Sequence, residues 1–313
     1  MSHQFEDGFF TIKPPWHGLG TVLPEAPADS KEAIRAANLD WRVEKQPLLT
    51  TEGVYVPNHY AVIRKKEGLR DSLGVVGNRY QPVQNIDAFN FFDQVIADGD
   101  ATYDAAGSLK GGSIIWILAK LNGPLRITKD DHVEKYLLLY NSHDGSSAVT
   151  MQFTPIRVVC HNTLTMAREL VNSAYSLSVR HTATVLYRMQ STAQYLGYVN
   201  DQFEHTGDAY RFLAGKKINT DQLEVYLQKL FPDPKGETKR NRNKATREKC
   251  IELFEVGQGT DVTGDNYWKA YNSVTEYVDH IRNRNNQEAR VRSAWMGQGH
   301  RLKSKALETA LAA

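Results

Sequence analysis

The sequence contains few cysteines and no long hydrophobic run. Cys160 and Cys250 are the two cysteines among 313 residues, too few and too far apart for a disulfide framework or a structural zinc site. No stretch approaches the roughly 18 apolar residues of a membrane-spanning helix, and the first residues do not resemble a signal peptide. These absences predict a cytoplasmic protein that does not enter the membrane.

Motifs of nucleotide and catalytic sites are also missing. The sequence has no G-x-x-x-x-G-K-[ST] loop and no strand-linked G-x-G-x-x-G segment, so it predicts neither a nucleotide-hydrolysing site nor a dinucleotide site. It has no carboxylate pair, metal-ligand spacing or nucleophile elbow. We therefore predict no cofactor, no metal and no catalytic residue.

Charge is nearly balanced over the chain but unevenly distributed along it. The net charge is +2, with 24% charged and 41% hydrophobic residues, which is ordinary for a globular protein of one large or two smaller domains. From Lys235 to Lys305, fifteen Lys and Arg accompany nine Asp and Glu, a net charge of +6. A basic tail is compatible with nucleic acid, although a solvated helix face is the usual explanation.

The segment from Tyr136 to Cys160 has the pattern of a β-hairpin. Tyr136–Tyr140 is a short apolar run, Asp144–Ser147 is a cluster of turn residues, and Ala148–Cys160 returns as a β-branched run. Side chains alternate between the faces of a strand, so we expect one buried and one wet face. Pro155 cannot donate a hydrogen bond to a neighbouring strand, which indicates a bulge or a sheet edge.

Further strands and helices alternate along the chain. The segment 11–20 is too rich in Pro and Gly for regular structure, so we expect an irregular N-terminal arm. Strand patterns lie in residues 41–76, 101–121 and 175–182. Helical patterns lie in residues 86–97, 164–170, 184–213, 221–231, 266–282 and 289–295. Asn85 is the expected cap of the first of these helices, and Asn162–Thr163 is the expected cap of the second.

These elements predict an α+β protein in which antiparallel hairpins and a meander pack against helices. The chain changes character after residue 215, where a short helix and a break containing Pro and Gly precede a basic segment. We predict a core domain with its irregular arm in residues 1–215 and a helical, basic C-terminal region in residues 216–313.

Six residues are candidates for contact with an anionic ligand. Arg79 and Tyr80 combine a cation with an aromatic ring just before a helix, which suits stacking on a base and binding its phosphate. Lys110 lies in a turn whose glycines could let backbone amides approach an anion, although a hairpin turn needs those glycines equally. In an apolar strand, Arg157 fits either a phosphate contact or an ordinary salt bridge. The last candidates, at the end of a strand, are Arg180 and His181.

Cys160 and His161 together suggest a nucleophile and its base. Consecutive strand residues point to opposite faces, so the two side chains would not normally reach one another. We therefore predict that Cys160 is a buried structural cysteine.

Five segments carry a family resemblance across nearly the whole chain: residues 15–20 (PWHGLG), 76–85 (VGNRYQPVQN), 154–164 (TPIRVVCHNTL), 179–182 (VRHT) and 271–280 (YNSVTEYVDH). They resemble a phage- and plasmid-borne family known as domain of unknown function 932. The resemblance implies no settled activity. At His161 that family pattern would have glutamine, which argues against a catalytic use of this histidine.

The order of parts is also similar to that of the single-strand annealing recombinases of phages and eukaryotes. This similarity implies a compact core of hairpins and helices, a basic groove, and helical additions toward the C-terminus. The expected function is single-stranded DNA binding and annealing in recombination or replication of a phage or plasmid, as a ring or filament in the bacterial cytoplasm and without a cofactor. Two alternatives stay open, a host-defence antagonist that binds proteins and an enzyme that uses Cys160. The expected DNA contacts are Arg79, Tyr80, Lys110, Arg157, Arg180 and His181.

Overall fold

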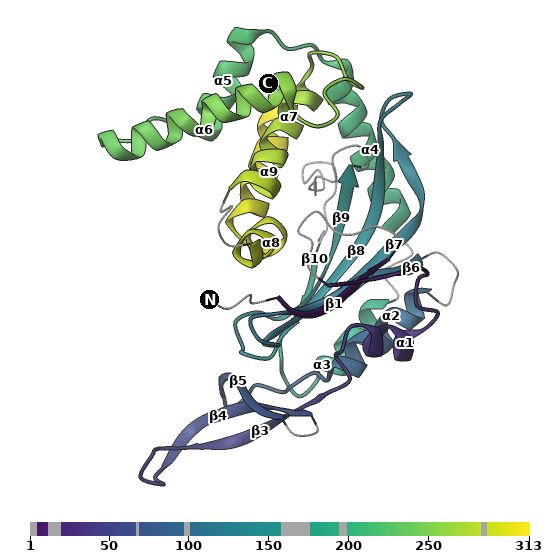
Figure 1. Cartoon of the computed structure of the whole chain (residues 1–313), viewed down its shortest axis with the longest axis vertical. Coiled ribbons are helices and arrows are strands. Elements are labelled where there is room, and N and C mark those ends of the chain that lie inside the picture. The colour runs from purple at the N-terminus through teal and green to yellow at the C-terminus, as the bar shows by residue number, and fades with distance from the viewer. Residues whose placement is uncertain are drawn as a thin grey trace. The chain divides into compact units, whose positions relative to one another are not determined.

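The computed structural model describes residues 5–11, 20–66, 69–96, 101–157, 176–193, 199–282 and 287–313 (Figure 1). The chain divides into two compact units, and each unit is assembled from separate stretches of sequence. The first unit contains residues 1–122, 136–152 and 176–197, and the second contains residues 123–135, 153–175 and 198–313.

A seven-stranded sheet has the strand order β10-β9-β8-β7-β6-β1-β2. β1 pairs with β2 in parallel and with β6 in antiparallel orientation, and β6–β7 and β9–β10 are also antiparallel pairs. β7, β8 and β9 each contain residues of both units. The bounds are β1 (Phe5–Thr11), β2 (Thr21–Leu23), β6 (Ala101–Leu109), β7 (Ile114–Arg126), β8 (His132–Ser142), β9 (Val149–Arg157) and β10 (Ser176–Val179).

Aromatic side chains fill the core between this sheet and a helix of the first unit. The unit contains α1 (Ser30–Ala36), α2 (Asn85–Ile96) and α3 (Val185–Ala193). On α2, Phe89 and Phe92 stack on the ring of Tyr103 in β6, with ring centroids 6.2 and 6.4 Å apart. All three side chains are fully buried. The apolar stripe that predicted α2 is therefore its core-facing side.

A second sheet of three strands forms an antiparallel meander. Its strands are β3 (Arg42–Leu49), β4 (Tyr55–Lys66) and β5 (Leu69–Gly77), in that spatial order. Gly53, which lies between β3 and β4, has a φ of 81°, a left-handed conformation that favours glycine. The pairing of β4 with β5 ends at His59 and Gly77. From there the chain continues through residues 78–84 to α2.

Helices make up most of the described part of the second unit. Its core contains Tyr210, Trp268 and Tyr271, and the rings of Tyr210 and Trp268 lie 4.8 Å apart. Trp268 also donates its indole N–H to Asp131 at 2.8 Å. The bounds are α4 (Val199–Gly215), α5 (Thr220–Leu230), α6 (Glu237–Val256), α7 (Tyr267–Glu276), the π-helix η3 (Tyr277–Ile281), α8 (Gln287–Met296) and α9 (Gln298–Leu311).

The predicted fold class is confirmed, because antiparallel strands combine with helices and the last third of the described chain is helical. The hairpin predicted in residues 136–160 is β8 and β9. Four elements were missed, namely β1, β2, α6 and α9; the basic segment after residue 235 and the polar end of the chain are both helical. The second unit includes α4, which the sequence analysis had assigned to residues 1–215. The division at residue 215 stays a prediction.

Several predictions fall on residues outside the described ranges. Most of the predicted irregular arm lies outside these ranges. So do the helix predicted in residues 164–170, its cap, and the environment of Cys160 and His161. The helix predicted in residues 184–213 is represented by α3 and α4, and residues 194–198 between them are also outside the description.

Candidate functional site

Two of the sequence segments that carry the family resemblance lie side by side in the first unit. The backbone N–H of Gln81 donates to the carbonyl oxygen of His181 at 3.0 Å. The His181 ring is also hydrogen-bonded to Gln81, with 3.1 Å between Nδ1 and the Gln81 carbonyl oxygen. The rings of Tyr80 and His181 stack with centroids 4.5 Å apart and planes inclined by 22°. Residues 79–81 and 180–182 therefore form a joined pair of segments, which we call the Tyr80–His181 junction.

The Tyr80–His181 junction is attached to the turn between β8 and β9. Tyr80 donates its hydroxyl hydrogen to the carbonyl oxygen of Ser142 at 2.7 Å. Burial and the negative charge of Asp144 both raise the pKa of the Tyr80 hydroxyl, so it stays protonated. From β3, Lys45 donates to the carbonyl oxygens of Asn78 and Tyr80, at 2.6 and 3.0 Å. Residues from β3 and from the β8–β9 turn thus fix the junction in one conformation.

His143, the first residue after β8, is completely buried beneath the turn. Its Nε2 lies 2.9 Å from Oδ1 of Asn85, and Nδ2 of Asn85 donates to the carbonyl oxygen of Leu39 at 2.9 Å. Because Asn85 uses its amide hydrogens on Leu39, its Oδ1 accepts and His143 Nε2 donates. Asn85 was predicted to cap α2, but its side chain bridges His143 and Leu39 instead.

The charge state of His143 follows from this burial. The pKa of His143 is lowered to about 3, mainly by desolvation and also by the nearby His181, while Asp144 opposes the shift. Its Nδ1 makes no hydrogen bond within the described residues. His143 is therefore a neutral, weakly basic group at physiological pH. Its contacts fit a positioning role better than that of a general base, whose pKa should lie near the working pH.

Asp144 organises the turn itself. Burial opposes ionisation of its carboxyl group, but hydrogen bonds from Ser146 and the charge of Lys110 outweigh that effect, and the pKa of Asp144 lies below its ordinary value. Oδ1 accepts from the Ser146 N–H at 2.9 Å, and Oδ2 lies 3.4 Å from Nζ of Lys110. A Cβ atom on Gly74 of β5 would lie 2.6 Å from the Asp144 Cα, so this close approach requires glycine.

A family match covers the Tyr80–His181 junction and the turn between β8 and β9. The family described as a domain of unknown function (DUF932) matches residues 72–295. The chain belongs to this family. No curated protein and no solved structure matches the chain.

Five of the six candidate residues of this DUF932 protein surround the junction or the adjoining turn. Tyr80 and His181 pack on each other, and His181 is 7% exposed. The side chain of Lys110 contacts Asp144. Arg79 and Arg180 are exposed, and neither is paired with a carboxylate in the part of the chain that the structure describes. The side chain of Arg157 lies outside that part.

Sequence reasoning missed the residues that hold these candidates in place. His143, Asp144 and Lys45 lie at a strand end, in a turn and on a neighbouring strand, and none was singled out as a site residue. A histidine three positions after the apolar run Tyr136–Tyr140 was a usable signal for His143, because a polar residue that becomes buried there needs a partner.

The described residues contain no group of three His, Cys, Asp or Glu side chains that could hold a metal ion. A search of the described helices likewise finds none that combines the length and the apolar character required to cross a bilayer.

Proposed function

We propose that this protein binds and anneals single-stranded DNA as a ring or filament, without a cofactor, in the recombination or replication of a phage or plasmid in the bacterial cytoplasm. One observation carries the proposal. Arg79 and Arg180 are exposed, and each directly precedes one of the two stacked rings of the junction, Tyr80 or His181.

Two guanidinium groups on a fixed base suit a phosphate backbone. The guanidinium group is always charged, is weakly hydrated and presents several donors to phosphate oxygens. The stacked rings and the backbone hydrogen bond between Gln81 and His181 hold the two arginine-bearing segments together before any ligand arrives. Binding then costs less ordering of the protein, because the contact groups are preorganised.

Tyr80 and His181 support binding indirectly in this proposal. Their rings contact each other, and the Tyr80 hydroxyl contacts Ser142. We expect them to orient the two arginines rather than to stack on bases. Lys110 is engaged with Asp144 and contributes to the turn.

The proposal is tested by binding of a fluorescent single-stranded oligonucleotide across a salt series. We compare the wild type with Arg79→Ala/Arg180→Ala, and we use Arg42→Ala as a control because Arg42 is an exposed arginine on β3. Each phosphate contact contributes about 0.7 to the slope of log affinity against log salt for single strands. The double variant should lower the slope by about 1.4, whereas the control should leave it unchanged.

Annealing and assembly need their own measurements on the same samples. Light scattering reports particle size, and energy transfer between two labelled complementary strands reports annealing. Faster strand pairing on large particles supports the proposal. A wild-type protein that ignores single-stranded DNA even at low salt overturns it, and a slope unchanged in the double variant removes the junction as the contact surface.

A further inference from the structure

The first half of α6 carries a strongly basic surface that the junction does not use. Residues 235–249 contain seven Lys and Arg and two Glu, a net charge of +5. The side chains of α6 that are buried, Cys250, Leu253 and Phe254, all lie in its second half. The first half is therefore a solvated, basic stretch of helix with no buried side chain.

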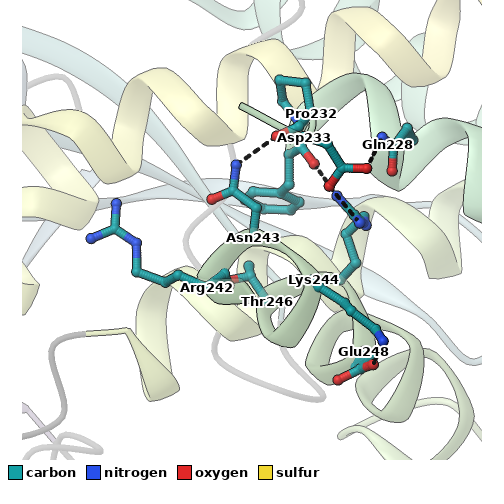
Figure 2. A network of polar contacts seen from close by, with 10 residues as sticks. Gln228, Pro232, Asp233, Arg242, Asn243, Lys244, Thr246 and Glu248 are labelled. Carbon is teal, nitrogen blue, oxygen red and sulfur yellow. Dashed lines mark hydrogen bonds and ion pairs between the residues drawn. The ribbon is translucent and has the colours of Figure 1, made fainter. Parts of the chain in front are cut away.

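The beginning of α6 is fixed to the segment that precedes it (Figure 2). Asn243 donates to the carbonyl oxygen of Pro232 at 2.7 Å. Arg247 forms a salt bridge to Asp233 at 3.0 Å, and the pKa of Asp233 is lowered mainly by hydrogen bonds from Gln228 and Arg247. These contacts join the end of α5 to the second and third turns of α6, so they fix the basic stretch relative to α5.

The cations of residues 235–249 divide into those that form salt bridges and those that do not. Arg247, Lys244 and Lys249 form salt bridges to Asp233, Glu248 and Glu252. Lys235, Lys239, Arg240 and Arg242 are exposed and have no salt bridge to any residue that the structure describes, although the charge of Arg240 contributes to the lowered pKa of Asp233. Lys239 and Arg242 are three positions apart, which places them on the same side of a helix, and Figure 2 shows Arg242 extending away from the contacts around Asn243.

Lys239 and Arg242 do not stabilise the helix that carries them. The positive end of a helix dipole is its N-terminus, where cations are unfavourable, yet Lys239 lies in the first turn of α6 and Arg242 in the second. Ala245 is the one apolar residue of this half, so the half has no core-facing stripe of its own. Glu237 is the acidic residue of the first turn, but Lys239 and Arg242 outnumber it in the first two turns, and a local arrangement that opposes helix stability is expected where a ligand compensates it.

We propose that Lys239 and Arg242 form a second contact surface for the phosphate backbone of single-stranded DNA. The occupant follows from charge complementarity, because two free cations on a solvated helix side match a flexible polyanion. This inference rests on the proposed function and extends it from the first unit to the second.

The experiment compares Lys239→Ala/Arg242→Ala with Lys244→Ala/Lys249→Ala. Both pairs remove two positive charges from the same helix, but the second pair removes cations that already have carboxylate partners. With a fluorescent single-stranded oligonucleotide at about 0.1 M salt, the first pair should weaken binding on the order of tenfold and lower the salt slope by about 1.4. The control pair should change either value much less. Circular dichroism checks that all variants keep their helix content.

The outcomes separate this inference from the proposed function. Equal effects of the two pairs overturn the α6 surface, whether or not Arg79→Ala/Arg180→Ala weakens binding. Weakening by Lys239→Ala/Arg242→Ala alone supports the α6 surface and removes the junction from the DNA path. If the wild type ignores the oligonucleotide but binds vesicles containing phosphatidylserine through Lys239 and Arg242, both proposals are overturned in favour of a membrane surface.

Discussion

At the scale of single residues, His143 is an ionisable side chain in a completely buried position. Its donor contacts Asn85, and its second nitrogen has no hydrogen-bond partner among the described residues. A protonated His143 would place in the interior a charge that Asp144 offsets only in part, which is costly. The residue therefore links the stability of the first unit to pH.

We predict that the free energy of unfolding falls as the pH drops below about 6.5. The unfolded ring binds its proton near pH 6.5, whereas the pKa of folded His143 is about 3. Between these values the unfolded state holds one more proton, so stability rises with pH by about 1.4 kcal/mol per unit and is lost on acidification. Urea unfolding at pH 7.5, 6.5, 5.5 and 4.5 measures this slope.

The matched variants are His143→Gln and His59→Gln. His59 is exposed, so its replacement should leave the slope unchanged. His143→Gln should flatten it by about one proton, although it also lowers stability at neutral pH. A slope that His143→Gln does not alter would contradict the assignment. The pKa of His181 is also lowered, mainly by burial, so some acid sensitivity should remain in His143→Gln.

At the scale of elements, β5 approaches the turn between β8 and β9 closely at one position. We predict that Gly74→Ala destabilises the protein by about 1–3 kcal/mol, as overpacking does, because the new Cβ would meet the Asp144 backbone. Gly77→Ala on the same strand is the control, since no atom lies within 4 Å of its Cβ position. Thermal unfolding compares the two variants. Equal stability of both would show that β5 and the turn separate readily.

At this scale, the sequence predicts helices and strands from their local residue patterns. The β8–β9 hairpin and the β3–β5 meander were predicted because apolar and β-branched runs alternate with clear turn residues. β1 was missed because Glu6, Asp7 and Gly8 interrupt its apolar pattern. The junction could not be predicted as a unit, because Gln81 and His181 are 100 residues apart. Local periodicity identifies elements, but it does not report which distant polar residues meet.

At the scale of the whole molecule, the second unit includes a segment that lies far ahead of its helices in the sequence. Residues 123–135 belong to it, and Asp131 is fully buried and accepts the indole hydrogen of Trp268. An early β-strand connection therefore completes a core that is otherwise made from the last third of the chain.

We predict that Asp131→Ala destabilises the second unit by about 1–3 kcal/mol, because it leaves the buried indole N–H of Trp268 without its partner. The neighbouring Asp130 is exposed, and Asp130→Ala should change stability by less than about 0.5 kcal/mol. Tryptophan fluorescence during urea unfolding follows the loss. Equal midpoints for the two variants would mean that the indole finds another acceptor at no cost.

The pairing of Asp131 with Trp268 also sets a minimum time for folding in the cell. The two residues are 137 positions apart, so at about 5–20 residues per second a ribosome needs about 7–27 s to make the second after the first. During that interval Asp131 must stay in water or in a temporary contact. The last helices to be synthesised therefore decide when the segment around Asp131 can reach its final state, and a nascent chain that stalls before residue 268 should be a substrate for chaperones.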